Sequence, residues 1–393
     1  MPRPALVRRR KVLFLVTEDW YFCSHRLPVA RAARAAGLEV IVATRVRAHG
    51  DRIRQEGFAV HSMAWRRRGD GLLGACRAIS EIAALYRAEQ PDLIHHIALK
   101  PVLFGGIARR LAFGASADAP VVVDAITGLG SGFSHTSLTG RLRRPWLGLY
   151  LRLTKSRDRR WIIVQNAEDH AALAKATVDR ARVVMIKGSG VDTAHFFPMP
   201  DPGSPVVTVA IVSRMLRTKG VLEAIAATRL LRERGLPIKL QLAGPIDPDN
   251  SGSLKAEFLT SLSEEPGIRW LGPVADVRTV WRRAAIALLP STYGEGVPKA
   301  LLEAAACSRP IIATDVPGCR EVVRPGETGI LVPPRDIPRL AAAIAELACD
   351  PGRRVKMGCA GRTLIERGFT EHIVAQETLA VYEAALREKA APE

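Results

Sequence analysis

The stretch AAIALLPSTYGEGVPKALLEAAACSRPIIATD, residues 284–315, places a helical segment between two short apolar runs. The runs at 284–290 and 309–315 have the length and composition of buried strands, and Pro298 stands where a helix through KALLEAAA would begin. Two strands joined by a helix form the crossover unit of a parallel sheet. The stretch therefore predicts a parallel-sheet α/β fold.

The same alternation of short apolar runs and helical segments occurs along the whole chain. It begins at residues 11–16, restarts at 206–213, and is interrupted at 198–205 by PMPDPGSP, which contains four prolines. We predict two Rossmann-like, doubly wound parallel-sheet domains that face a cleft, over residues 1–197 and 206–370. A Pro-rich linker at 198–205 joins them, and residues 371–393 form a C-terminal helix that can cross back to the first domain. A ligand is expected in the cleft, at the carboxyl ends of the strands.

Length and composition are those of an ordinary soluble protein. The chain has 393 residues, of which 48% are hydrophobic, enough for two cores. We find no apolar run of about 18 residues, so we expect no membrane-spanning helix. The cysteines are scattered without the spacing of zinc ligands or of a disulfide framework, so we expect reduced thiols in a cytosolic protein.

Positive charge is concentrated in the first half of the chain. Residues 1–200 contain 32 Lys and Arg against 16 Asp and Glu, whereas residues 201–393 contain 25 against 23. The segment RLRRPWLGLYLRLTKSRDRR, residues 141–160, has eight basic residues and one acid, interleaved with Trp, Tyr and Leu. It predicts a face for an anionic membrane surface, with a solvated helix as the alternative. We expect no nucleic-acid partner, because no nucleic-acid-binding motif accompanies the charge.

A candidate anion site follows the first strand of the second half. The segment SRMLRTKG, residues 213–220, places Arg214 and Lys219 in the turn and at the start of the next helix. Cations beside the amides of a helix N-terminus suit a diphosphate. Taken alone this signal is weak, because basic loop residues are often simply solvated.

Two carboxylates stand eight residues apart in the opening stretch. Glu295 lies in the glycine-containing loop, and Glu303 lies just over one turn into the helix. Near a phosphate site they can accept hydrogen bonds from the hydroxyls of two sugars, such as a ribose and a second glycosyl group. The alternative is structural, with Glu295 solvated and Glu303 paired with an Arg of a neighbouring helix.

These segments resemble glycosyltransferase family 4, a family of retaining enzymes with the GT-B fold. EGVPKALLE fits the family's E-x7-E pattern, and SRMLRTKG, GSGVD and ATDVPGCRE occur in the family's order. The N-terminal stretch EDWYFCSHRLPVARAARAAGLEVIVAT is similar to bacterial members that build capsule, exopolysaccharide or lipopolysaccharide. The resemblance implies that Arg214 and Lys219 hold the donor diphosphate, Glu295 the transferred sugar and Glu303 the ribose. It also implies that the backbone after Glu295 contacts phosphate and sugar, namely at Gly296, Val297, Pro298 and Lys299.

The first half fits the family less closely. Many members carry an H-x-H pattern after the fourth strand, but here the segment is DLIHHIALKP, with Ile97 in the place of the second His. Adjacent strand residues point to opposite faces, so one of His95 and His96 can face the cleft, and we predict that His96 does so as a catalytic residue. Further acceptor or cleft candidates at strand ends are His25, Arg26, Lys100, Thr127 and Gly128.

No metal or other cofactor is expected. The DPD triplet at 247–249 imitates a metal-binding motif of the other glycosyltransferase fold, but its Pro-containing context predicts a turn. With Arg, Lys and helix amides around the leaving diphosphate, electrostatic stabilisation would be the main catalytic contribution. The resemblance implies retention of anomeric configuration, and the sequence offers no evident enzymic nucleophile for a double displacement.

We therefore expect a retaining hexosyl- or N-acetylhexosaminyltransferase. Its donor would be a nucleotide-diphosphate sugar, with UDP ahead of GDP, and its acceptor a lipid-linked saccharide such as a polyprenyl diphosphate saccharide, in capsule, exopolysaccharide or lipopolysaccharide synthesis. Its place would be cytoplasmic, peripherally associated with the inner face of the cell membrane. The alternatives are a nucleotide-sugar epimerase of the same fold and a non-catalytic basic membrane-binding protein.

Overall fold

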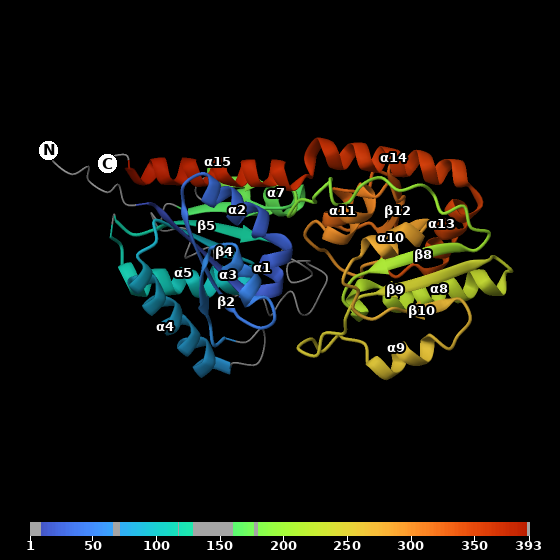
Figure 1. Ribbon diagram of the computed structural model, residues 1–393, viewed down its shortest axis with the longest axis horizontal. Coiled ribbons are helices and arrows are strands. Elements are labelled where there is room, and N and C mark those ends of the chain that lie inside the picture. Colours follow the sequence, from blue (N-terminus) through green and yellow to red (C-terminus); the bar gives the residue numbers. More distant parts are fainter. Residues whose placement is uncertain (1–8, 66–70, 117, 129–159, 177–179, 391–393) are drawn as a thin grey trace. The chain divides into compact units, whose positions relative to one another are not determined.

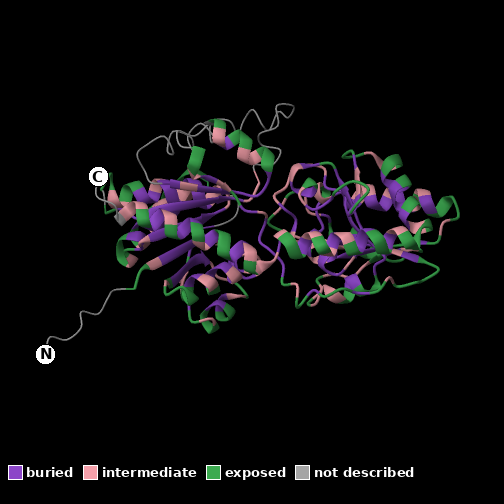
Figure 2. Ribbon diagram, turned by 90° about the horizontal axis from the view of Figure 1, so that it is seen from above, coloured by how far each residue is buried: buried purple, intermediate pink, exposed green. Residues whose placement is uncertain are grey.

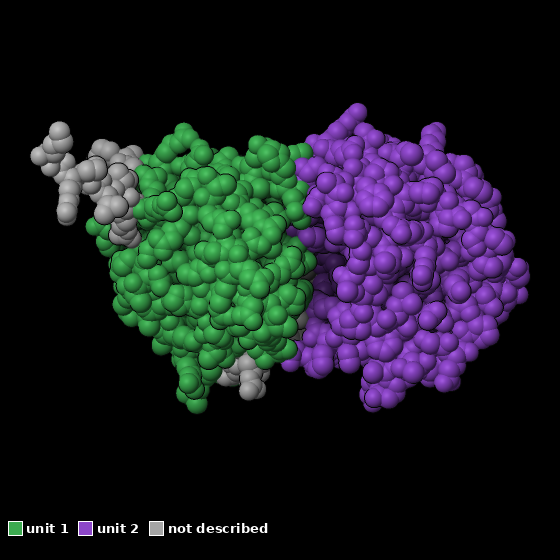
Figure 3. Space-filling view, viewed as in Figure 1, with its two compact units in different colours: residues 1–186, 371–393 green, residues 187–370 purple. Residues whose placement is uncertain are grey.

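The computed structural model describes residues 9–65, 71–116, 118–128, 160–176 and 180–390. The chain divides into two compact units (Figure 3), one of residues 1–186 with 371–393 and one of residues 187–370. The division after Ile186 lies about ten residues before the domain boundary expected at 197. The C-terminal helix α15 (Glu371–Ala390) belongs to the first unit.

The first unit is built on a seven-stranded parallel sheet with the order β3-β2-β1-β4-β5-β6-β7. Its central strands are almost wholly buried (Figure 2), as expected where helices cover both sides of a parallel sheet, and their mostly apolar side chains include the buried polar residues His95, His96 and Asp124. The strands are β1 (Lys11–Glu18), β2 (Glu39–Arg45), β3 (Ala59–Ser62), β4 (Leu93–Ile97), β5 (Val121–Ile126), β6 (Arg160–Val164) and β7 (Val183–Met185).

Helices pack on both faces of this sheet because alternate strand residues point to opposite sides. Phe14 of β1 joins a core with α2 and α15, whereas Leu13 and Leu15 join a second core with α4 (Figure 1). The helices of the unit, besides α15, are α1 (Asp19–His25), α2 (Leu27–Ala35), α3 (Gly50–Gln55), α4 (Gly71–Glu89), α5 (Leu99–Phe113) and α7 (Ala167–Ala176), with a 3-10 turn at Arg180–Arg182.

The second unit repeats the architecture with a six-stranded parallel sheet in the order β10-β9-β8-β11-β12-β13. The strands are β8 (Val207–Val212), β9 (Ile238–Ala243), β10 (Ile268–Trp270), β11 (Ile286–Leu289), β12 (Ile311–Thr314) and β13 (Gly329–Val332). The helices are η3 (Arg217–Lys219), α8 (Val221–Glu233), α9 (Ala256–Leu262), α10 (Arg278–Arg283), α11 (Lys299–Ala306), α12 (Pro317–Arg320), α13 (Ile337–Cys349) and α14 (Pro351–Gly368). The expected fold, two doubly wound parallel-sheet domains, is confirmed.

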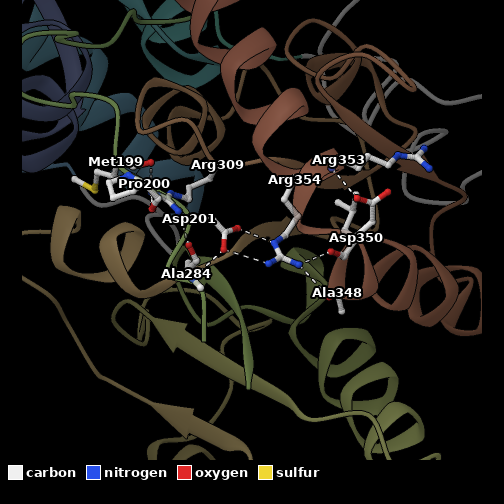
Figure 4. Close-up of polar contacts among 11 residues, drawn as sticks. Met199, Pro200, Asp201, Ala284, Arg309, Ala348, Asp350, Arg353 and Arg354 are labelled. Atoms are coloured by element: carbon white, nitrogen blue, oxygen red, sulfur yellow. Dashed lines mark hydrogen bonds and ion pairs between the residues drawn. The ribbon is translucent and has the colours of Figure 1, made fainter. Parts of the chain in front are cut away.

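The segment expected to be a linker is anchored to the second unit by buried arginines (Figure 4). Arg354 of α14 forms a bidentate ion pair with Asp201, with N–O distances of 2.7 and 3.1 Å. Arg309 donates to the carbonyls of Met199 and Pro200 at 2.6 and 2.7 Å. Both guanidinium groups are nearly inaccessible to solvent, and the Pro-rich segment up to Asp201 is therefore an integral part of the second unit.

Two sequence features lie partly or wholly outside the described residues. Of the basic segment at 141–160, the structure describes Arg160 alone, where β6 begins. Of the TGLGSG segment at 127–132, it describes Thr127 and Gly128. Within the described part of the chain, no helix combines the length and the apolar character needed to cross a bilayer.

Candidate functional site

The candidate anion site lies where the strand order of the second sheet reverses. β8 pairs with β9 on one side and with β11 on the other, although β11 follows much later in the chain. The loops after β8 and β11 therefore leave the carboxyl edge of the sheet next to each other. This reversal point is where open α/β sheets bind their ligands.

Lys219 and Glu295 meet at this point. The Lys219 ammonium group donates to one carboxylate oxygen of Glu295, and the Ser291 hydroxyl donates to the other. The side chains of Lys219 and Glu295 are only 16% and 11% exposed. Glu295 is therefore not a solvated loop carboxylate, and its charge is matched by the lysine predicted to hold a diphosphate.

The two loops are fixed to each other by backbone contacts. Gly220 has a φ of 72°, and a Cβ placed on it would lie 1.8 Å from the carbonyl oxygen of Pro290, so only glycine fits. The N–H of Thr292 donates to the carbonyl of Thr218 at 3.0 Å. The hydroxyl of Thr314, at the end of β12, donates to the Ser291 carbonyl at 2.6 Å. The positions of Lys219 and Glu295 are thus set by backbone close to both residues.

Arg214 is paired with a residue that the sequence analysis assigned to a turn. Its guanidinium group forms an ion pair with the Asp247 carboxylate, with the side chains 27% and 12% exposed. The expected turn is present, because the N–H of Asn250 donates to the Asp247 carbonyl at 2.9 Å. Asp247 thus joins the candidate site as a residue that sequence reasoning missed, because spacing along the chain does not specify that β8 and β9 are neighbours in the sheet.

Helix α11 begins at the end of the glycine-containing loop. Pro298 is its N-cap residue, with φ −72° and ψ 121°, and Lys299 is its first helical residue. The first amides of a helix have no intrahelical acceptor and form the positive end of its dipole. Val297 is buried, whereas Gly296, Lys299 and Glu303 are half-buried. The structure thus brings the candidate donor-binding residues to one edge of one unit.

Two thiols of the second unit, Cys319 near Glu295 and Cys307 at the C-terminal end of α11, are unsuited to nucleophilic chemistry. Burial raises the pKa of Cys307 to about 12, and burial with the nearby Glu295 carboxylate raises the pKa of Cys319 well above its ordinary value. Both groups stay protonated at neutral pH, and a protonated thiol is a poor nucleophile.

The histidine pair in the first unit is buried on both faces of β4. His95 and His96 have no exposed surface. His95 interacts through Nδ1 with the Tyr382 hydroxyl at 2.5 Å, and His96 contacts Asp124 through Nδ1 at 2.7 Å and the Tyr86 hydroxyl through Nε2 at 2.9 Å. The two rings do point to opposite faces. In this structure, however, His96 presents no surface to a ligand, contrary to the expectation that it faces a cleft.

The surroundings of His96 form a closed network. Asp124 also binds Arg160 at 3.0 Å, and all of these side chains are buried. A Cβ on Gly105 of α5 would lie 2.2 Å from Nε2 of the His96 ring, so the helix approaches the ring as closely as its backbone allows. Burial lowers the pKa of His96 even though the Asp124 carboxylate opposes this, so the imidazole is neutral at neutral pH.

The other candidates of the first unit follow strands β1, β4 and β5, which are neighbours in the sheet. His25, at the end of α1, stacks on Tyr21 with ring centroids 4.1 Å apart. Lys100 lies over the rings of Trp65 and Phe104, at 5.8 and 5.2 Å from their centroids. Thr127 and Gly128 are half-buried, whereas Arg26 is buried. Lys100, Thr127 and Gly128 thus lie just after the carboxyl ends of β4 and β5.

Comparisons with known proteins agree with this architecture. The model "Glycosyl transferase 4-like" matches residues 11–166, and "Glycosyl transferases group 1" matches residues 206–350. The chain is 28% identical over 180 residues, 46% of its length and 47% of the relative's, to the "Capsular polysaccharide biosynthesis glycosyltransferase CapM" of Staphylococcus aureus. The matches span about half the length of the first curated relatives.

One relative matches over nearly its whole length. It is the "N,N'-diacetylbacillosaminyl-diphospho-undecaprenol alpha-1,3-N-acetylgalactosaminyltransferase" of Campylobacter jejuni, 23% identical over 92% of this chain and 95% of the relative. Among solved structures, Anabaena Alr3699/HepE in complex with UDP and glucose superposes with a TM-score of 0.74 at 18% identity, over 95% of this chain and 100% of that one. The chain therefore belongs to the glycosyltransferases of the GT-B fold, with a family-4-like first half and a group 1 second half.

Proposed function

We propose that the protein transfers a sugar from a nucleotide-diphosphate donor to a lipid-linked saccharide in the synthesis of a bacterial surface polysaccharide. The observation that carries this proposal is the ion pair of Lys219 and Glu295 beside the start of α11, at the strand-order reversal of the second sheet. A cation, a carboxylate and helix amides at one point match a diphosphate joined to a sugar.

Binding of the donor would exchange partners within this site. Lys219 and Arg214 now neutralise Glu295 and Asp247, and a diphosphate would take over both cations. The Glu295 carboxylate would then accept hydrogen bonds from the hydroxyls of the transferred sugar, and Glu303 from the ribose. The charge that develops on the leaving diphosphate would be stabilised by Lys219, Arg214 and the amides at Gly296, Val297 and Lys299, without a metal ion.

The nature of the partners is proposed from relatives. UDP is bound by HepE, and the Campylobacter relative carries a diphospho-undecaprenol in its name. We infer a UDP-sugar as donor, a polyprenyl diphosphate saccharide as acceptor bound by the first unit, and retention of anomeric configuration. The enzyme would act peripherally at the cytoplasmic face of the membrane, where such acceptors are accessible to nucleotide sugars.

Calorimetric titration with UDP, GDP and ADP in the presence of EDTA tests the donor site. We expect selective binding of one nucleotide, weakened at least tenfold by Lys219→Ala and by Glu303→Ala. Lys239→Ala, which removes an exposed lysine of β9, is the matched control and should bind like the parent. Absence of binding by any nucleotide at millimolar concentration would contradict the donor-site assignment.

Transfer itself is tested with the nucleotide so identified, its sugars, and a short-chain polyprenyl diphosphate saccharide. NMR of the product gives the anomeric configuration, which we expect to match that of the donor. Conversion of the donor sugar to its epimer without an acceptor would instead identify an epimerase of the same fold.

A further inference from the structure

The most exposed large apolar side chains of the described residues lie together on α4 of the first unit. Leu72 and Leu73 are 82% and 88% exposed, in the first turn of this 19-residue helix. Figure 1 shows α4 on the outer side of the unit, next to α5. Two adjacent leucines at this exposure are unusual for a surface that faces only water.

These leucines are not needed for the core of the unit. The inward face of α4 is complete without them, because Ala78, Ile82, Ala83 and Tyr86 are buried against the sheet. Tyr86 also reaches the His96 network at 2.9 Å. The buried face of α4 thus holds the helix in place, and Leu72 and Leu73 are not needed for this packing.

The exposed side of α4 carries cations, and its carboxylates are turned elsewhere. Glu81 accepts from the N–H of Ala64 at 3.2 and 3.3 Å, and Glu89 pairs with Lys11 and His61 at 3.2 and 2.9 Å. The solvent-facing positions follow helical spacing and form what we call the α4 outer face, made of Leu72, Leu73, Cys76, Arg77, Ser80, Ala84 and Arg87.

The neighbouring helix continues this surface. Arg87 donates to the carbonyl of Leu111 in α5 at 2.5 Å, and Leu111 is 56% exposed beside the exposed Arg110. Helix α5 contains no acidic residue over Leu99–Phe113. Within the described residues of α4 and α5, apolar side chains are flanked by arginines and no carboxylate of these two helices is directed outward, which complements a layer of anionic headgroups above a hydrocarbon interior.

We propose that the α4 outer face docks on an anionic lipid bilayer, with Leu72 and Leu73 entering the interface and Arg77 and Arg87 facing the headgroup phosphates. The inference deepens the proposed function and rests on it in one respect, because a lipid-linked acceptor requires the enzyme at such a surface. The docking face lies on the unit assigned to the acceptor.

Co-sedimentation with vesicles tests the proposal without any assay of transfer. The full chain is mixed with vesicles of phosphatidylglycerol and phosphatidylcholine, and with phosphatidylcholine alone. We expect binding to the anionic vesicles that the double change Leu72→Ser with Leu73→Ser weakens by about tenfold, and Arg77→Glu by several-fold. Val355→Ser and Arg234→Glu, at exposed positions of the second unit, are matched controls and should bind like the parent.

Cys76 supplies a second measurement that does not depend on altering the leucines. In a chain with Cys349→Ser and Cys359→Ser, Cys76 is the exposed thiol left for an environment-sensitive fluorophore. We expect its emission to shift to the blue on anionic vesicles, whereas the same dye on Cys349, with Cys76→Ser and Cys359→Ser, should not shift. Equal binding by the leucine variant, or an unshifted dye on Cys76 when the chain is bound, would overturn the proposal.

Sedimentation equilibrium distinguishes a lipid surface from a second copy of the chain as the partner of the α4 outer face. A parent that dimerises through the leucines and ignores vesicles would overturn the lipid assignment. Nucleotide binding by calorimetry should be the same for parent and leucine variant. If the parent binds nucleotide but not anionic vesicles, the docking face is refuted and the proposed function is not. If the parent binds anionic vesicles but no nucleotide, the proposed function is refuted and the docking face is not.

Discussion

The ammonium group of Lys219 binds the carboxylate of Glu295 across 76 residues of sequence, at the point where the strand order of the second sheet reverses. Each group is mostly shielded from water, so each depends on the other for charge compensation when no ligand is present. In the proposed function, a diphosphate would replace the carboxylate at Lys219, and Glu295 would then accept hydrogen bonds from the hydroxyls of a sugar.

Removing the Lys219 ammonium group should make the transition state of sugar transfer less stable. We expect Lys219→Ala to lower kcat for transfer by about 100-fold or more, because a cation at the leaving diphosphate is lost. Steady-state kinetics with the donor identified by calorimetry measures this effect. Lys219→Arg should recover part of the rate, whereas an unchanged kcat in Lys219→Ala would contradict the assigned role.

The close approach at Gly220 gives a prediction about stability. Gly220→Ala combines a positive φ with a Cβ at 1.8 Å from the Pro290 carbonyl oxygen, so the loops after β8 and β11 must separate. Gly235→Ala is the matched control, because its φ is 80° but its Cβ would meet no atom within 4 Å. We expect Gly235→Ala to cost about 1 kcal/mol in the free energy of unfolding and Gly220→Ala at least twice that, measured by urea titration. Equal losses of unfolding free energy in the two variants would show that the positive φ alone accounts for the effect and that the close approach to Pro290 adds nothing.

Because Asp201 anchors the Pro-rich segment to Arg354, we predict that removal of its carboxylate strongly lowers the free energy of unfolding. Asp201→Ala would leave the Arg354 guanidinium group buried without its bidentate partner, and we expect the free energy of unfolding to fall by about 3 kcal/mol. Asp315→Ala removes an exposed partner of Arg320 and should cost less than about 1 kcal/mol. Thermal unfolding of both variants distinguishes them, and a similar small loss in each would mean that the anchor is dispensable.

The buried histidines predict a loss of stability in mild acid. Burial lowers the pKa of His95 well below its ordinary value, and burial also lowers the pKa of His96. In the unfolded chain the histidines have a pKa of about 6.5, so the unfolded chain binds protons more readily than the folded chain. Stability is therefore fully present above that pH and falls as the pH drops below it, by up to about 1.4 kcal/mol per pH unit for each histidine.

Urea titrations between pH 7.5 and 5.5 measure this dependence. His95→Gln should flatten it, because one neutral buried imidazole is removed. His372→Gln, which changes an exposed histidine of α15, should leave the dependence as it is in the parent. A parent whose unfolding midpoint is constant over this range would contradict the prediction.

Local patterns were sufficient to predict the strands that precede Arg214 and Glu295 and the two loops that follow those strands. The apolar runs that precede Arg214 and Glu295 are β8 and β11, and a parallel α/β sheet brings the loops after its strands to one edge. Strand length, glycine in a loop and proline at a helix start are short-range features, so they can be recognised without knowledge of distant packing.

Features set by distant partners could not be predicted in the same way. The burial of His95 depends on Tyr382, 287 residues later, and that of His96 on Asp124 and Tyr86. The segment at 198–205 was predicted to be a linker because its own residues do not indicate the contacts that Arg309 and Arg354 make with it. Pairing of Arg214 with Asp247 likewise requires the order of strands in the sheet, which spacing along the chain does not specify.

The return of α15 to the first unit limits how the two units of this chain can be exchanged with those of relatives. The helix carries Tyr382 into the core beside Phe14 and His95, so the first unit is formed by two separate stretches, residues 1–186 and 371–393, and the second by the stretch between them. A chimera that exchanges residues 1–186 alone would pair a foreign sheet with a native closing helix. Exchange of residues 187–370 as a cassette keeps both cores intact and offers a direct way to move donor specificity between relatives.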